Sequence, residues 1–475
     1  MVRPEVILRP EPQFYDTYAV FNHRTCMTEF LSEEECRALQ YIYERSADIS
    51  TIALQSNMTG KSCRKFLDRM VKLGYVLANA DDPMVKPPER LAVKREAYRS
   101  FSLSFLSAPT SVDIFVTNRC NLKCVHCFSS KDDKMIHELS LEKLESIFDQ
   151  LEKLGVLEVR INGGEPLLHP EIHEILEALG RRKFRRVILT NGTLLGKEIL
   201  TLLRQANVIP TISLDGSKGE QHDAFRGVKR SFDDTIKALE LLHEANIEYG
   251  INCCLHKKNL ATYEDIIDLA VKYGSSRISF LDLKISNTLR RHLDWVPSYK
   301  EYQEIVPYLV LSRARYRTKI DVSLSTFMHC YPLEEAVAEV RNGYVSCKAG
   351  RTRLSIDCDG SVYPCNLVIS DPRWAMGNIN DQRILDIWFS QKWSFFRGDV
   401  KISDLILCRN CKDSDKCQDF FCRLLPYLEN GNPFGPIPSV AELIVVLEAW
   451  AILEKVASER HFVLRRAITS REPSR

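Results

Sequence analysis

Strands and amphipathic helices alternate along the middle of the chain. Short runs rich in β-branched residues alternate with longer stretches in which apolar positions recur with a helical period. Each connection is long enough for a crossover helix, so the six strands should pair in parallel with the helices outside. We therefore predict an α/β fold with a partial (β/α)6 barrel over 111–329. The predicted strands are 112–117, 157–162, 186–190, 209–214, 248–254 and 277–283, and the predicted helices are 140–154, 170–180, 196–205, 231–246 and 261–273.

The first 80 residues follow a different pattern. Alternating polar and apolar residues flank a turn at Asn22-His-Arg, as in a β-hairpin. A helix should begin after Ser32, which with Glu35 has the pattern of a capping box, and further helices are predicted over 49–56 and 61–73. Gly74-Tyr-Val-Leu resembles a wing strand. We predict a winged-helix-like domain over 1–80, followed by a proline- and charge-rich linker over 81–110.

Composition indicates a globular protein. The chain has 65 Lys and Arg against 63 Asp and Glu, so its charge gives no argument for a nucleic-acid or membrane partner. Its N-terminus lacks the apolar stretch of a secretion signal, and no run approaches the ~20 apolar residues that cross a bilayer. We expect a cytoplasmic protein. In that compartment, sixteen cysteines favour metal ligation over disulfides.

Three of these cysteines follow the first predicted strand of the barrel. Cys120, Cys124 and Cys127 have the spacing C-x3-C-x2-C, and Phe128 follows the last of them. Three thiolates can hold three irons of a cubane cluster and leave the fourth iron open, whereas a structural zinc site needs four ligands. This motif resembles the hallmark of the radical S-adenosylmethionine (SAM) superfamily. The competing interpretation is a zinc knot with a distant fourth ligand.

Further motifs follow the next predicted strands. Asn162-Gly-Gly-Glu-Pro resembles the Gly-Gly-Glu-Pro motif of the family, which usually has Thr at the first position. Thr190-Asn-Gly, Ser213-Leu-Asp-Gly and a later Arg-Gly also match, and all lie where parallel α/β sheets bind ligands. The resemblance implies that the glycines and the glutamate contact the methionine end of SAM, and that the serine and the arginine hold its ribose and carboxylate. The SAM-binding residues so predicted are Gly163, Gly164, Glu165, Asn191, Ser213 and Arg226.

The resemblance also implies a reaction. A [4Fe-4S] cluster on Cys120, Cys124 and Cys127 would reductively cleave SAM to methionine and a 5′-deoxyadenosyl radical, using a low-potential electron donor such as flavodoxin or ferredoxin. The protein would hold the substrate hydrogen near the radical carbon and keep water out.

Residues 330–439 contain eight of the sixteen cysteines and predict a metal-organised domain with little regular core. Their spacing resembles the SPASM extension, which carries auxiliary [4Fe-4S] clusters. The resemblance implies one cluster on Cys347, Cys365 and Cys422 and a second on Cys408, Cys411 and Cys417.

Some features depart from the SPASM pattern. Ser439 stands where the last cysteine is expected, four residues separate Cys417 from Cys422, and either Cys330 or Cys358 could complete the first cluster. A zinc ribbon on the four cysteines from Cys408 to Cys422 is the alternative. An apolar helix and a basic tail are predicted over 440–475.

The N-terminal domain gives evidence about the class of substrate. In front of a radical SAM and SPASM chain, it resembles the peptide-recognition element of ribosomal-peptide maturases, similar to the pyrroloquinoline-quinone carrier protein, in which a leader peptide adds as a strand to the hairpin edge. A merely structural appendage and a DNA-binding domain are the alternatives, and against DNA binding the basic helix over 61–72 shares its domain with several glutamates. We predict an enzyme that installs a thioether or carbon–carbon crosslink in a ribosomal peptide. The alternatives are a maturase of the sulfatase-maturing type and an iron–sulfur redox sensor that regulates transcription.

Overall fold

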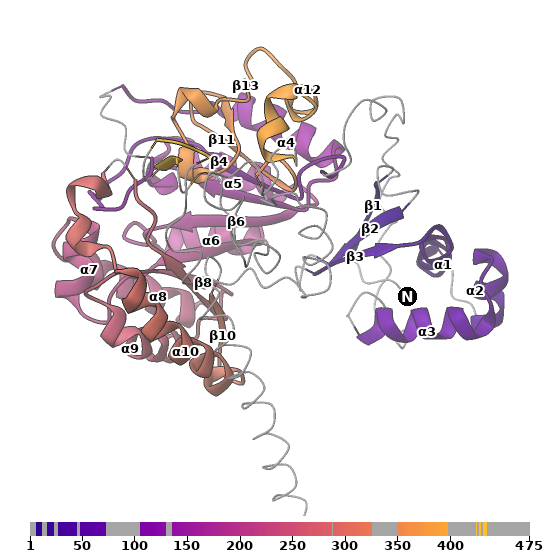
Figure 1. Ribbon diagram of the computed structural model, residues 1–475, viewed down its shortest axis with the longest axis horizontal. Coiled ribbons are helices and arrows are strands. Elements are labelled where there is room, and N and C mark those ends of the chain that lie inside the picture. Colours follow the sequence, from indigo (N-terminus) through magenta and orange to yellow (C-terminus); the bar gives the residue numbers. More distant parts are fainter. Residues whose placement is uncertain are drawn as a thin grey trace, which may run out of the picture.

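In the computed structural model, the described residues form two sheets, one of three and one of ten strands (Figure 1). The described residues are 6–11, 17–22, 27–44, 48–72, 105–129, 135–286, 288–324, 349–397, 424, 427–428 and 431–434. In this part of the chain, no helix is long and apolar enough to cross a membrane.

The N-terminal unit, residues 6–72, has its own core. Strands β1 (Val6–Glu11), β2 (Thr17–Asn22) and β3 (Met27–Leu31) pair antiparallel in the order β1-β2-β3. Helices α1 (Glu33–Glu44), α2 (Ile49–Ser56) and α3 (Gly60–Lys72) follow, and residues such as Leu39, Ile52 and Phe66 are buried together. The predicted hairpin and three helices are confirmed, whereas β1 was not predicted. The expected wing strand lies outside the described residues.

The cap of the first helix follows from its sequence. Glu35 N–H donates to Ser32 Oγ at 3.2 Å, and Ser32 N–H donates to Glu35 Oε2 at 3.2 Å. These reciprocal hydrogen bonds satisfy two donors that the first helical turn would otherwise leave without partners. The predicted capping box is therefore confirmed.

The large sheet forms a partial barrel, as predicted. Among the described residues, the barrel strands run parallel; they are β4 (Ser111–Phe115), β5 (Glu158–Asn162), β6 (Arg185–Thr190), β7 (Val208–Ser213), β8 (Gly250–Leu255), β9 (Arg277–Asp282) and β10 (Asp321–Leu324). The sheet does not close, because β10 and β13 stand at opposite ends of the strand order. Six of these strands were predicted and β10 was not.

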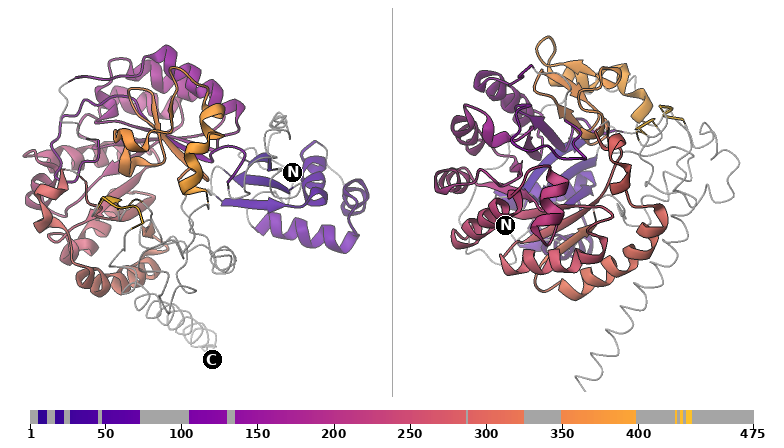
Figure 2. Two further views of the ribbon diagram at one scale, coloured as in Figure 1. Left: turned by 45° about the horizontal axis from the view of Figure 1, so that its top comes forward. Right: turned by 90° about the vertical axis from the view of Figure 1, so that its left-hand side faces the viewer.

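Helices lie outside this curved sheet (Figure 2). They are α4 (Leu141–Lys153), α5 (Ile172–Gly180), α6 (Lys197–Gln205), α7 (Gly219–Arg226), α8 (Ser231–Glu244), α9 (Tyr263–Lys272) and α10 (Tyr299–Tyr316). Strand residues that face these helices, such as Ile114, Ile161 and Ile212, are fully buried. Helices α7 and α10 were missed by the sequence patterns.

The opposite face of the sheet, which we call the inner face, is partly open to solvent. Along β7, Val208, Pro210 and Ile212 are buried, whereas the alternate residues Ile209, Thr211 and Ser213 are partly exposed. Strand β8 shows the same alternation in Gly250, Asn252 and Cys254. Since neighbouring side chains of a strand point to opposite faces, the barrel has an accessible interior lined by small and polar groups.

Residues 349–397 extend the barrel sheet. Strand β11 (Arg353–Ile356) pairs parallel with β4, and β12 (Ser361–Tyr363) and β13 (Gly377–Asn378) continue antiparallel. Trp388, on α12 (Ile384–Trp388), and Trp393 are fully buried in the barrel core. Our expectation of little regular core was therefore wrong for this stretch, because it shares the apolar core of the barrel.

Residues 105–110 also belong to the core, although they are part of the segment 81–110 whose prolines and charges predicted a linker. Phe105 and Leu106 are buried, and Leu106 O accepts a hydrogen bond from Trp388 Nε1 at 2.9 Å. The packed part of the barrel thus begins before β4.

Candidate functional site

The three cysteines of the barrel motif lie on one loop after β4, residues 117–129, which we call the cysteine loop. Each sulfur has a hydrogen-bonding group beside it. Leu122 N–H donates to Cys120 Sγ at 3.4 Å, an Arg226 nitrogen donates to Cys124 Sγ at 3.7 Å, and Cys127 Sγ lies 3.5 Å from a serine hydroxyl. Donors of this kind stabilise metal-bound thiolates and tune the cluster they hold.

The electrostatics of the loop fit a cluster and disfavour free thiolates. Burial raises the pKa of Cys120 to about 12, and the neighbouring Cys124 and Cys127 sulfurs add to the rise. Three thiols so close together ionise readily only when a cationic centre binds them. Within the described ranges, no three His, Cys, Asp or Glu side chains converge on a single ion. A cubane does not require that, because each thiolate binds a different iron.

One side of the cysteine loop is fixed by the Gly-Gly-Glu-Pro segment. Gly164 N–H donates to Thr117 O and Glu165 N–H donates to Arg119 O, both at 2.7 Å. A Cβ on Gly164 would lie 2.2 Å from Arg119 O, and one on Gly163 would lie 2.8 Å from Thr117 O. We explained these glycines by close approach of the ligand, whereas their tightest contacts here are with the loop backbone.

The other side of the loop is fixed by the end of α7. Lys123 N–H donates to Arg226 O at 3.1 Å, and Val125 N–H donates to Phe225 O at 3.0 Å. Gly227 has a φ of +74°, and a Cβ there would lie 2.2 Å from Lys123 O. Only glycine meets both conditions. Two glycine motifs far apart in sequence therefore hold the loop between them.

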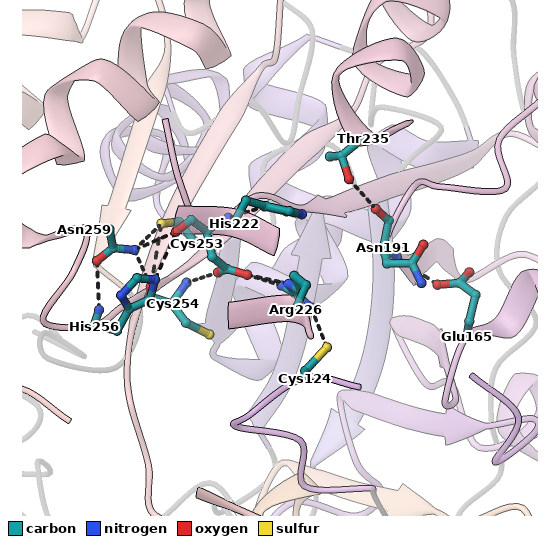
Figure 3. Close-up of polar contacts among 11 residues, drawn as sticks. Cys124, Glu165, Asn191, His222, Arg226, Thr235, Cys253, Cys254, His256 and Asn259 are labelled. Atoms are coloured by element: carbon teal, nitrogen blue, oxygen red, sulfur yellow. Dashed lines mark hydrogen bonds and ion pairs between the residues drawn. The ribbon is translucent and has the colours of Figure 1, made fainter. Parts of the chain in front are cut away.

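Glu165 is a buried carboxyl that lies beside Asn191 (Figure 3). It accepts hydrogen bonds from Thr190 Oγ1 at 2.6 Å, Asn191 N–H at 2.8 Å and Leu167 N–H at 3.2 Å. Burial outweighs these donors and raises its pKa to about 7. Since a carboxylate offers about four acceptor positions, one remains for a further donor.

Asn191 and Ser213 occupy the ends of β6 and β7. The Asn191 side chain donates to Asn121 Oδ1 at 2.9 Å, so it reaches the cysteine loop. Its backbone carbonyl accepts from Thr235 Oγ1 at 3.1 Å. Ser213 lies on the inner face and is partly exposed. Both predicted residues are thus on the edge of the sheet that carries the cysteine loop.

Sequence patterns did not single out Asp215 as a site residue, although it belongs to a motif that matched. It is fully buried and forms an ion pair with Arg226. Burial would raise the pKa of Asp215, but Arg226 and nearby histidines lower it overall. The available signal was its position directly after β7, opposite the arginine that ends α7.

Histidines near the loop are packed side chains. His126 stacks on Phe225 of α7 with ring centroids 4.3 Å apart. Burial lowers the pKa of His126 to about 3, and those of His222 and His256 to about 4. All three rings are therefore neutral near pH 7.

The other cysteines divide into two groups. Cys36, Cys63 and Cys253 are buried small side chains, while Cys254 is partly exposed on the inner face. Of the auxiliary-cluster candidates, Cys365 follows β12 and Cys358 is buried. The remaining candidates and Ser439 lie outside the described residues; these candidates are Cys330, Cys347, Cys408, Cys411, Cys417 and Cys422.

Comparison with known proteins decides the family. Residues 114–270 match the radical SAM superfamily, and residues 347–412 match SPASM, an iron–sulfur cluster-binding domain. The mycofactocin maturase MftC of Mycobacterium tuberculosis (strain ATCC 25618 / H37Rv) is 31% identical over 316 residues, which are 66% of this chain and 78% of MftC. The chain belongs to the radical SAM superfamily. It is therefore an enzyme that uses a [4Fe-4S] cluster and SAM, and its SPASM domain implies auxiliary iron–sulfur clusters. These predictions are confirmed.

Other relatives agree with this assignment. The antilisterial bacteriocin subtilosin biosynthesis protein AlbA of Bacillus subtilis (strain 168) is 30% identical over 274 residues, 57% of each chain. Among solved structures, Streptococcus suis SuiB bound to its precursor peptide SuiA has a TM-score of 0.70 at 18% identity, covering 93% of this chain and 99% of SuiB. The structure of native anSMEcpe with bound AdoMet has a TM-score of 0.57 at 21% identity, covering 74% of this chain and 100% of anSMEcpe. At these identities, the structural likeness establishes the fold.

Proposed function

We propose that this enzyme modifies a ribosomally made precursor peptide by installing a thioether or carbon–carbon crosslink. The observation that carries the proposal is the N-terminal unit in front of a radical SAM and SPASM chain. The likeness to SuiB covers 93% of this chain. Because the unmatched part is shorter than the N-terminal unit, the match must include at least some of this unit. MftC is named a maturase and AlbA a bacteriocin biosynthesis protein, which also supports a peptide substrate.

Different residues of the barrel would have different roles in the reaction. Cys120, Cys124 and Cys127 would hold the cluster, which when bound supplies the electron that cleaves SAM at its open iron. The glycines on either side of the cysteine loop keep the three thiolates in place. The partly exposed inner face offers the peptide an entrance lined by small and polar side chains.

SAM would bind along the edge that carries the cysteine loop. Glu165, with one acceptor position left, would pair with the SAM ammonium. Because the pKa of Glu165 is about 7, the carboxyl is only partly ionised by itself, and the nearby cation would favour its ionised form. The other residues proposed to contact SAM are Gly163, Gly164, Asn191, Ser213 and Arg226.

The leader of the peptide would bind to the N-terminal unit. Its sheet has two edge strands, β1 and β3, and an extended peptide can add to either through main-chain hydrogen bonds. The basic helix α3 is less suited to DNA than its sequence suggests, because Arg69 forms a salt bridge with Glu35 of α1 at 2.9 Å. Because Arg69 is paired with a carboxylate, its positive charge contributes less to the attraction of DNA phosphates.

Hydrogen–deuterium exchange of the full chain tests this placement. A synthetic leader peptide should slow exchange in Val6–Glu11 or Met27–Leu31 and leave α2 unchanged. A scrambled peptide of the same composition is the control. Protection confined to α3, together with a mobility shift of double-stranded DNA, would support the transcription-regulator alternative instead.

The auxiliary clusters, when bound, would supply one-electron redox chemistry. Cys347, Cys365 and Cys422 would serve one cluster, and Cys408, Cys411 and Cys417 the other. Flavodoxin or ferredoxin would reduce the SAM-cleaving cluster in the cytoplasm. Iron above four per chain after anaerobic reconstitution supports this arrangement, whereas four irons and one zinc support a zinc ribbon.

The direct test of the proposed function uses a precursor peptide encoded by a short reading frame beside the gene. With SAM and reductant, the peptide should change mass, and the same core without its leader should react far more slowly. Modification of a sulfatase-derived peptide and not of the precursor would favour the sulfatase-maturing alternative.

A further inference from the structure

The carboxylate of Asp215 is held from several directions. Its Oδ2 accepts from Arg226 Nε at 2.5 Å and forms an ion pair with a second guanidinium nitrogen. Its Oδ1 accepts from Cys254 N–H on β8 at 2.7 Å. The side chain is fully buried, so these contacts are shielded from water and strong.

The backbone of Asp215 is held as firmly as its side chain. Asp215 N–H donates to His222 Nδ1 at 3.2 Å, and its carbonyl accepts from His256 Nε2 and from the Asn259 amide, both at 3.1 Å. Asn259 also donates to Cys254 O at 2.8 Å (Figure 3). A network from α7, β8 and the loop after β8 therefore fixes one carboxylate.

This network determines the direction of the Arg226 guanidinium. Two of its three nitrogens bind Asp215, and the third donates to Cys124 Sγ at 3.7 Å. Figure 3 shows Arg226 between the β8 residues and Cys124. A planar guanidinium held along one edge cannot turn without breaking both contacts with Asp215.

We propose that Asp215 is a positioning residue that holds Arg226 against Cys124 and thereby sets the reduction potential of the SAM-cleaving cluster. The inference rests on the proposed role of Cys124 as a cluster ligand. Reduction adds one negative charge to the cluster, and a cation fixed beside a ligand sulfur stabilises that charge. Arg226 therefore favours the reduced cluster, and Asp215 ensures that the cation stays in place.

Removal of the Asp215 charge distinguishes positioning from simple electrostatics. If Asp215 acted only through its charge, Asp215→Asn would remove a negative group and favour the reduced cluster. If Asp215 acts by holding Arg226, the same substitution disfavours reduction, because Arg226 loses its charged partner. The proposal requires the second result.

The experiment is a potentiometric titration of the reconstituted full chain, followed by electron paramagnetic resonance. The relevant signal is the cubane signal that changes when SAM is added. At a fixed solution potential, Arg226→Gln should lower the ratio of reduced to oxidised cluster about tenfold, which equals about 59 mV for one electron. Asp215→Asn should lower the ratio about threefold, and it should add nothing in the Arg226→Gln background.

Two further variants complete the design. Arg226→Lys keeps the cation and should lower the ratio less than Arg226→Gln does. Asp113→Asn is the matched control, since Asp113 is also fully buried and paired with an arginine, Arg160 at 2.8 Å, but within the described residues its side-chain partners are Arg160, Asn162 and Arg353 and do not include the cysteine loop. It should leave the ratio unchanged. If the Gln and Asn variants do not hold iron, Arg226→Lys and Asp215→Glu, which keep both charges and change only their positions, test the positioning claim: each should lower the ratio, and unchanged ratios in both would overturn the inference.

Three outcomes with the Gln and Asn variants overturn the inference: an unchanged ratio in Arg226→Gln, a raised ratio in Asp215→Asn, or a full effect of Asp215→Asn in the absence of Arg226. A wild-type protein without a SAM-responsive cubane contradicts the proposed function itself. A normal wild-type signal with unshifted variants contradicts only the role of Asp215.

Discussion

Alanine at Gly164 should remove the SAM-cleaving cluster while the barrel remains folded. The added Cβ would lie 2.2 Å from Arg119 O and 2.6 Å from Arg119 C, both backbone atoms of the cysteine loop. Ordinary contact therefore requires the loop to move by about 1 Å. Gly164 cannot yield easily, because its N–H and that of Glu165 both bind the loop at 2.7 Å.

The energetic cost follows from these contacts. Overpacking of this kind costs about 1–3 kcal/mol, and weakening the two backbone hydrogen bonds adds about 1–2 kcal/mol. A total of about 2–5 kcal/mol exceeds what a short loop can absorb without leaving its position. The barrel core is separate from this contact. The substitution should therefore displace the cysteine loop and reduce the amount of iron bound, and it should leave the barrel folded.

Two glycines nearby make a graded series. Gly163→Ala places Cβ 2.8 Å from Thr117 O, a smaller overlap, and should retain part of the iron. Gly196→Ala is the control, because nothing lies within 4 Å of its Cβ and its φ is −129°. It should change stability by less than about 1 kcal/mol.

Iron content, SAM cleavage and urea unfolding measure this series. Gly164→Ala should lose about four irons per chain, consistent with one missing cubane, and should release no 5′-deoxyadenosine. Its far-ultraviolet circular dichroism should match that of the wild type. Full iron content and SAM cleavage in Gly164→Ala would refute the idea that this contact holds the cysteine loop.

Other predictions test the site more directly. Cys124→Ala should abolish 5′-deoxyadenosine release, and equal turnover would contradict the cluster assignment. Because burial raises the pKa of Glu165 from 4.5 to about 7, the folded metal-free protein binds an extra proton between these values. Its unfolding free energy should therefore fall by about 3 kcal/mol as pH rises through this window. Glu165→Gln should remove that decrease in urea titrations, and an unchanged slope would show that Glu165 does not titrate there. Exchange of Val6–Glu11 or Met27–Leu31 should slow with leader peptide, as described above.

The sequence predicted those elements that are encoded by patterns within a short stretch of residues. The strands from β4 to β9 have a periodic apolar face, and the cysteine loop has its ligands within eight residues of each other. Strand β1 was missed because Pro10 argues against a strand, although a proline is tolerated at an edge such as this one. Strand β10 has only four residues, too few for a clear alternation.

Contacts between segments that are far apart along the chain could not be predicted from the sequence. Strand β11 pairs with β4, so Ser355 lies opposite Asp113. Nothing in either strand encodes that partner. Likewise, Gly164 and Gly227 matched motifs, but their shared role in holding the cysteine loop depends on two turns that meet only in the folded barrel. Asp215 was missed as a site residue for the same reason.

The central claim is that three thiolates on the cysteine loop leave one iron open for SAM. Electron paramagnetic resonance of anoxic, dithionite-reduced protein tests it most directly. We predict a cubane signal whose shape changes when SAM is added and which disappears in Cys124→Ala. A reduced wild-type protein that gives no such signal, or one indifferent to SAM, would contradict the account.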